Sequence, residues 1–75
     1  MAIKIVFPKD PEQMRSFITT CEILADSEAD ITGLGSVVDD GELRLQPEPG
    51  SIAYTADFGS VYQLSPFGKW TKVGG

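Results

Sequence analysis

The side chains best suited to chemistry are the three acids of Asp26-x-Glu28-x-Asp30. Their spacing matches the opening of a calcium-binding loop. Such a loop also needs glycine at its sixth position and glutamate at its twelfth, where this chain has Ile31 and Val37. The segment is therefore interpreted as a solvated acidic loop, and cation binding by its three acids stays an open alternative.

Two further short motifs carry weaker signals. Asp39-Asp40-Gly41-Glu42 has three carboxylates, but Asp-Gly is also a preferred two-residue hairpin turn, so a polar turn is favoured over a metal site. Gly33-x-Gly35 lacks the third glycine and the strand-to-helix context of a phosphate-binding loop. The sequence thus predicts no metal and no cofactor.

Catalytic side chains are sparse. The chain has no histidine, and Cys21 is its one cysteine. Ser-His-Asp and Cys-His arrangements are therefore excluded, and zinc has few ligands. A carboxylate pair could act as in glycosidases, but a sheet this short offers little room for a sugar. We predict that the protein is not an enzyme and that Cys21 is a small buried hydrophobic residue.

The length and charge of the chain limit which partners it can have. Its 75 residues predict one small domain, 1–75, whose hydrophobic core contributes no more than ~3–5 kcal/mol of folding stability without further support. A single cysteine cannot form an internal disulfide, so oligomerisation or docking on a larger assembly is expected. The net charge of −5 argues against nucleic acid and against an anionic membrane surface.

The elements that must position these residues begin with a strand and a helix. Residues 2–7 alternate as a strand does. Asp10, Pro11 and Gln13 form a helix start, and apolar residues then recur at steps of three and four. We expect an amphipathic helix at about 11–26, with this apolar stripe: Met14, Phe17, Ile18, Cys21, Leu24 and Ala25.

The rest of the chain reads as β-structure. Segments 36–39 and 43–46 flank Asp40-Gly41 and predict a hairpin, and Pro47 to Gly50 forms a stiff break. Three further strands are expected at 52–56, 61–64 and 70–73. The predicted fold is α+β, with a strand–helix unit at 2–26 and hairpins and a β-meander at 36–73, one helix packing on the antiparallel meander.

Aromatic residues are concentrated in the predicted meander. Cross-strand packing explains such a group, but three short strands cannot bury five rings, and Tyr and Trp are enriched at binding hot spots. Phe58 and Phe67 fall in turns, where burial is hardest. We therefore predict an interface that includes these residues: Tyr54, Phe58, Tyr62, Phe67 and Trp70.

Residues 49–73 resemble a segment of small bacteriophage head- and tail-associated proteins, including head-fibre-like proteins. The shared features are Pro-Gly-Ser at 49–51, Asp-x-Gly at 57–59, Val-Tyr-x-Leu at 61–64, and a glycine turn followed by x-Trp-x-x-Val at 69–73. The resemblance implies a structural role in the virion. Residues 1–46 match nothing specific.

The expected function is therefore that of a non-enzymatic virion structural or decoration protein, made in the host cytoplasm and located in the virion. Its partners would be a capsid, neck or tail protein and further copies of itself. The alternative is a small acidic phage protein that binds and regulates or inhibits a host protein, with acids 26–30 and 39–42 meeting a basic surface. The N-terminal apolar run is too short for a signal peptide, and no segment is long enough for a membrane span.

Overall fold

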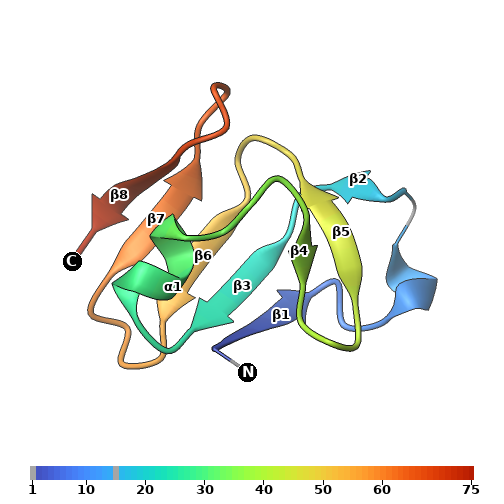
Figure 1. The fold of residues 1–75 in the computed structure, drawn as a ribbon, viewed down its shortest axis with the longest axis horizontal. Helices are drawn as coiled ribbons and strands as arrows, with labels where there is room; N and C mark the ends of the chain where they lie inside the picture. The colour runs from blue at the N-terminus through green and yellow to red at the C-terminus, as the bar shows by residue number, and fades with distance from the viewer. Residues whose placement is uncertain (1, 15) are drawn as a thin grey trace.

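A computed structural model describes residues 2–14 and 16–75 of the chain (Figure 1). The described residues form two β-sheets, one short α-helix and one 3-10 turn. The elements in chain order are β1 (Ile3–Phe7), η1 (Pro11–Gln13), β2 (Ile18–Thr19), β3 (Glu22–Ala25), α1 (Glu28–Thr32), β4 (Val38–Asp39), β5 (Arg44–Pro47), β6 (Ile52–Thr55), β7 (Val61–Leu64) and β8 (Trp70–Gly74). The broad class is α+β, as predicted.

The larger sheet has five strands in the order β1-β3-β6-β7-β8. Strands β3 and β6 pair in parallel, whereas β1–β3, β6–β7 and β7–β8 pair antiparallel. The smaller sheet has the order β2-β5-β4, and it includes the hairpin that Asp40-Gly41 predicted. Gly41 has a φ of 93°, which explains why glycine stands in this turn.

The helix predicted at 11–26 is wrong. Asp10 does cap a helical turn, since its carboxylate accepts a hydrogen bond from Gln13 N–H, but the turn is the 3-10 element η1 and Met14 is already extended. The apolar residues of this stretch also fit a period of two. Cys21, Ile23 and Ala25 are buried, and Glu22 is exposed between them, so β3 alternates as a central strand does.

The described α-helix lies instead in the segment predicted to be a solvated loop. Ser27 precedes α1, and the Asp30 carboxylate accepts hydrogen bonds from the Ser27 N–H at 3.1 Å and its hydroxyl at 2.9 Å. The Asp30 side chain thus satisfies the backbone N–H of the residue that precedes the helix, as the third helical residue of a capping box does. The loop interpretation of the first acidic motif is therefore wrong for Glu28 and Asp30.

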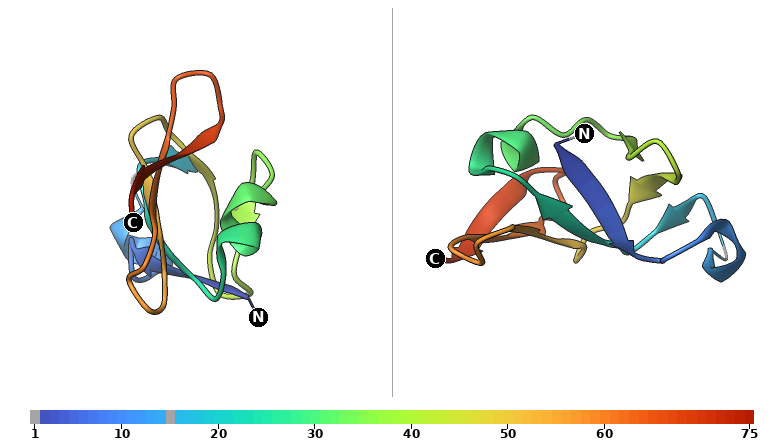
Figure 2. Two further views of the ribbon diagram at one scale, coloured as in Figure 1. Left: turned by 90° about the vertical axis from the view of Figure 1, so that its left-hand side faces the viewer. Right: turned by 90° about the horizontal axis from the view of Figure 1, so that it is seen from below.

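The core lies between the five-stranded sheet and a second layer. Ile23 and Ala53 face Ile31 of α1 and the β4–β5 hairpin, which contributes Val38 and Leu45. Figure 2 shows α1 and this hairpin on one side of the large sheet. Cys21 is buried in the same core, as predicted, and this burial raises the pKa of its thiol.

Candidate functional site

The five-stranded sheet has two unlike faces. The inner face carries the core. The outer face points away from α1 and the hairpin, and no described helix or strand is laid over it in Figure 2. Strand alternation and the registers assign these side chains to the outer face: Lys4, Phe7, Glu22, Leu24, Ile52, Tyr54, Val61, Gln63, Thr71 and Val73.

The centre of the outer face is apolar. Leu24, Tyr54 and Val61 lie side by side on β3, β6 and β7, and each is partly exposed. Val73 on the edge strand is 57% exposed. Most half-exposed antiparallel sheets carry polar residues on the solvent side, so a row of this kind indicates a contact surface.

The five aromatics of the predicted interface separate into three positions. Tyr62 is buried on the inner face, and Trp70 packs partly buried against the core. Tyr54 lies on the outer face, where the Phe58 ring stacks on it with a centroid distance of 5.6 Å. Phe67 stands apart from the other four. Contact with a partner stays a prediction for all five.

The turn between β7 and β8 projects beyond the rest of the molecule (Figure 1) and carries Phe67. The Phe67 side chain is 90% exposed. Yet the turn is tightly bonded, because the Ser65 hydroxyl oxygen accepts from Phe67 N–H at 3.3 Å and Lys69 N–H at 3.2 Å. Gly68 donates to the Ser65 carbonyl at 3.0 Å and has a φ of 81°, which glycine adopts without steric cost.

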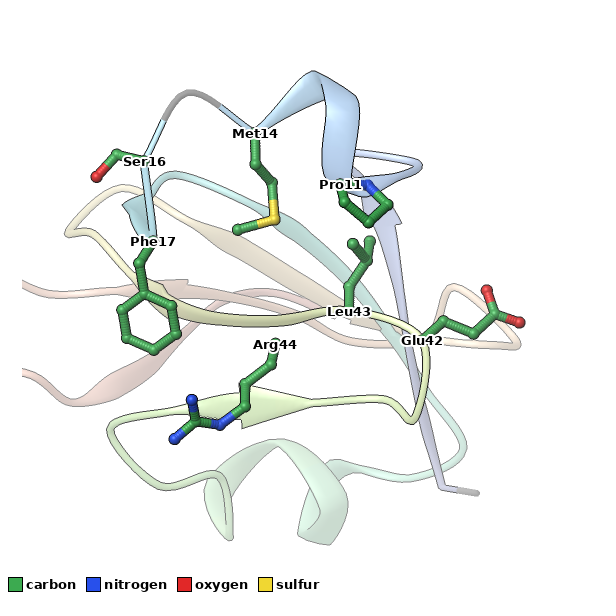
Figure 3. Close-up of a pocket in the computed structure, with 7 residues that line it drawn as sticks. All are labelled: Pro11, Met14, Ser16, Phe17, Glu42, Leu43 and Arg44. Carbon is green, nitrogen blue, oxygen red and sulfur yellow. The ribbon is translucent and has the colours of Figure 1, made fainter.

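A shallow groove lies at the other end of the molecule, between η1 and the β4–β5 hairpin (Figure 3). Met14 and Leu43 point toward each other across it, and the Arg44 guanidinium lies 5.3 Å from the centroid of the Phe17 ring. The Glu42 side chain points away from these residues. Four of the seven residues that line the groove are apolar, and the other three are Ser16, Glu42 and Arg44, so the groove offers mainly a surface for packing.

A polar cluster holds α1 against the inner face. The Glu28 carboxylate accepts hydrogen bonds from the Ser60 hydroxyl at 2.7 Å and the Tyr62 hydroxyl at 3.1 Å, and it forms an ion pair with Lys72 at 2.9 Å. The bond from Lys72, with those from Ser60 and Tyr62, lowers the pKa of Glu28 to about 2. Burial and the nearby Glu28 raise the pKa of Tyr62, so Tyr62 keeps its proton at neutral pH. The cluster therefore acts as a set of contacts that bind α1 to the large sheet.

Asp40 performs a similar task for the hairpin. One carboxylate oxygen accepts from the N–H groups of Glu42 and Leu43, and the other accepts from Ile5 N–H on β1 at 3.0 Å. Burial opposes ionisation of Asp40, but these backbone donors together hold its pKa below its ordinary value. The second acidic motif is thus a turn, as predicted, that also covers the free edge of β1.

The described residues contain no cluster of three or more acids and thiols that could hold a metal ion. Among residues 2–14 and 16–75, no helix has the length and apolar character to cross a membrane.

Sequence reasoning missed the outer face because it assigned Leu24 to a helix and so did not place it in a sheet beside Tyr54. The available signal was the run Ile52-Ala-Tyr-Thr55 together with Val61-Tyr-Gln-Leu64, in which apolar residues occur at both alternate sets of positions and Thr55 and Gln63 are the exceptions. Such runs are typical of strands that are buried on both faces.

The described residues form a small α+β fold that is mostly β-structure. Comparisons with protein-family models, with curated proteins and with solved structures return no match to the chain.

Proposed function

We propose that this chain is a non-enzymatic bacteriophage virion structural or decoration protein that docks on a capsid, neck or tail protein through Phe67. The observation that carries the proposal is the turn at the tip of the β7–β8 hairpin. Its hydrogen bonds hold an aromatic ring almost fully in solvent, where the ring contributes nothing to the core of its own chain.

Such a ring is suited to bind a partner. Aromatic side chains that enter a pocket at the centre of an interface often contribute most of its binding energy. Because the backbone of the turn is already fixed by hydrogen bonds, it loses less conformational freedom on binding than the backbone of a mobile loop would. The partner is therefore expected to present an apolar pocket wide enough for a phenyl ring.

The virion setting is supported by the resemblance of residues 49–73 to small head- and tail-associated phage proteins. The segment with this resemblance includes the Phe67 turn. The alternative role as a host-directed acidic inhibitor gains no support from the acids themselves. Glu28, Asp30 and Asp40 bond to groups of their own chain, which leaves them poorly placed to meet a basic partner.

The proposal is tested on particles. The tagged chain is produced in host cells during infection by the phage whose genome encodes it, and purified particles are analysed by quantitative mass spectrometry. We expect the wild-type chain in particles and at least a ~10-fold loss for Phe67→Ser, because a buried aromatic anchor contributes ~2 kcal/mol or more.

Phe17→Ser is the matched control, since it makes the same change at a ring that is 41% exposed, lies outside the predicted interface and lines the groove at the other end of the molecule. Its incorporation should be close to wild type. A chain that is abundant in infected cells and absent from purified particles would contradict the virion role. Equal incorporation of wild type and Phe67→Ser would contradict docking through Phe67.

A further inference from the structure

The outer face is unusual in its charge. The chain has eleven acids and six bases, yet the five strands of the large sheet contain three charged residues, Lys4, Glu22 and Lys72. Lys72 lies on the inner face, where it pairs with Glu28. The outer face therefore holds one cation and one anion, so it is electrically neutral on a molecule of net charge −5.

The outer face is large enough for a small interface. Its five strands have 4 or 5 residues each, so the sheet is roughly 24 Å wide and about 13–17 Å long. In Figure 1 these strands fill the left and middle of the view, and the smaller sheet and η1 extend the molecule to the right. A partner that covered the face would bury on the order of 500 Å² per side, which is at the low end for a specific complex. Two sheets can pack face to face with an apolar layer about 10 Å thick between them.

Charge complementarity selects a second copy as this partner. In a two-fold symmetric interface, every contact from one residue to another is made twice. Lys4 and Glu22 lie near each other on β1 and β3, and each has no ionic partner among the described residues. Two outer faces related by a two-fold axis can place each Lys4 against the other copy's Glu22. The remaining acids lie outside the five strands of the large sheet.

We propose that the outer face binds the outer face of a second copy of this chain, so that two five-stranded sheets form a sandwich. Leu24, Ile52, Tyr54 and Val61 form its apolar centre, and Lys4 and Glu22 form its ionic rim. The arrangement goes beyond the proposed docking function, which uses Phe67 at the tip of a hairpin. A dimer would present two such tips, which raises the strength of attachment without any new contact.

Sedimentation velocity of the purified chain over a range of concentrations tests the dimer. The wild type is expected at twice 8.1 kDa at micromolar concentration. Leu24→Lys and Ile52→Lys should each weaken self-association at least ~10-fold, because each places an unpaired charge in an apolar contact. Both substitutions make the net charge less negative, so general repulsion between copies cannot explain their effect.

Ala29→Lys is the control, since it adds the same charge at an exposed position on α1, over the opposite face of the sheet. It should leave self-association unchanged. Trp70 fluorescence reports folding of each variant, because Trp70 packs on the inner face and away from the contact. Two outer-face variants are used so that one which fails to fold does not decide the result.

A charge exchange tests the ionic rim. Lys4→Glu alone and Glu22→Lys alone should each self-associate more weakly than the wild type, because each puts like charges in contact twice. An equimolar mixture of the two should recover a heterodimer, in which both contacts join opposite charges. This recovery is a readout that a merely destabilised fold cannot produce.

A wild-type chain that sediments as a monomer up to millimolar concentration would overturn the dimer, as would a dimer unaffected by both folded outer-face variants. A mixture no more associated than its two components would overturn the Lys4–Glu22 pairing. These outcomes are separate from those of the particle experiment, because Phe67→Ser should lower incorporation into particles and leave the dimer intact.

Discussion

The two faces of the large sheet are built from the same strands but differ in what surrounds them. On the inner face Ile23 and Ala53 are fully buried beneath α1 and the β4–β5 hairpin. On the outer face their sequence neighbours Leu24 and Ile52 are partly exposed, although they are equally apolar. The difference shows that the covering layer, and not the strand sequence, decides which face is the core of a single chain. That layer is held by a few identifiable contacts, each of which can be removed.

The largest expected effect is at the centre of the covered face. Leu45 is 0% exposed in the hairpin layer. Leu45→Ala should lower the free energy of unfolding by ~3–4 kcal/mol through lost burial and a residual cavity, and so leave much of this small protein unfolded. Urea titration followed by Trp70 fluorescence measures it.

Leu24→Ala makes the same chemical change on the outer face. Under dilute conditions it should cost about 1 kcal/mol or less, because the removed atoms already meet water. Equal destabilisation by the two substitutions would mean that the outer face is covered within a single chain, and the contrast between the faces would be lost.

A smaller effect is expected where the hairpin is fastened to the sheet. Asp40→Ala removes the acceptor of three backbone N–H groups, one of them on β1, and should cost about 2 kcal/mol, as charge-assisted hydrogen bonds do. Asp39→Ala is the neighbouring control, since Asp39 accepts only a local bond from Gly41 N–H and is exposed. Thermal unfolding of both variants at neutral pH gives the comparison. A larger loss of stability for Asp39→Ala would mean that the hydrogen bonds within the turn stabilise the hairpin more than the bond between Asp40 and β1 does.

Much of the β-structure follows from local residues. Asp40-Gly41, Asp57-Phe-Gly59 and the turn at Gly68 punctuate the chain, and the strands between them lie close to where these turns place them. The helix at 11–26 fails for a general reason, since apolar residues at 17, 18, 21, 24 and 25 suit a helical period while 21, 23 and 25 suit a strand. Local patterns could not choose between them. The choice is made by β1 and β6, which pair with β3 from distant parts of the chain.

The candidate site also has parts that local sequence predicts and parts that it does not. The exposure of Phe67 was predictable, because a ring in a glycine turn has no core to enter. The helix α1 left a usable signal in Ser27-x-x-Asp30, which has the spacing of a capping box, followed by Gly33. The outer face had no such local signal, since it exists only once the parallel pairing of β3 with β6 brings Leu24 beside Tyr54.

The smallest expected loss of stability concerns the polar cluster around Glu28 that holds α1 over the inner face, and this loss depends on pH. The folded chain lowers the pKa of Glu28 from 4.5 to about 2, so ionised Glu28 stabilises the fold. This stabilisation is present in full above about pH 4.5 and is lost as the pH falls through about 2, because below that value the carboxyl is protonated in both the folded and the unfolded chain. Glu28→Gln should therefore be less stable than the wild type at pH 7 and should approach it in acid.

The difference in stability between Glu28→Gln and the wild type should also shrink in high salt, since the Lys72 pair is solvent-exposed. Urea midpoints at several pH values measure this, with Glu48→Gln in an exposed loop as the control for the same change of charge. A Glu28→Gln deficit that stayed constant from pH 7 to pH 2 would show that ionisation of Glu28 does not stabilise the fold. The absence of any deficit at pH 7 would show that α1 is held by the packing of Ile31 and not by this polar cluster.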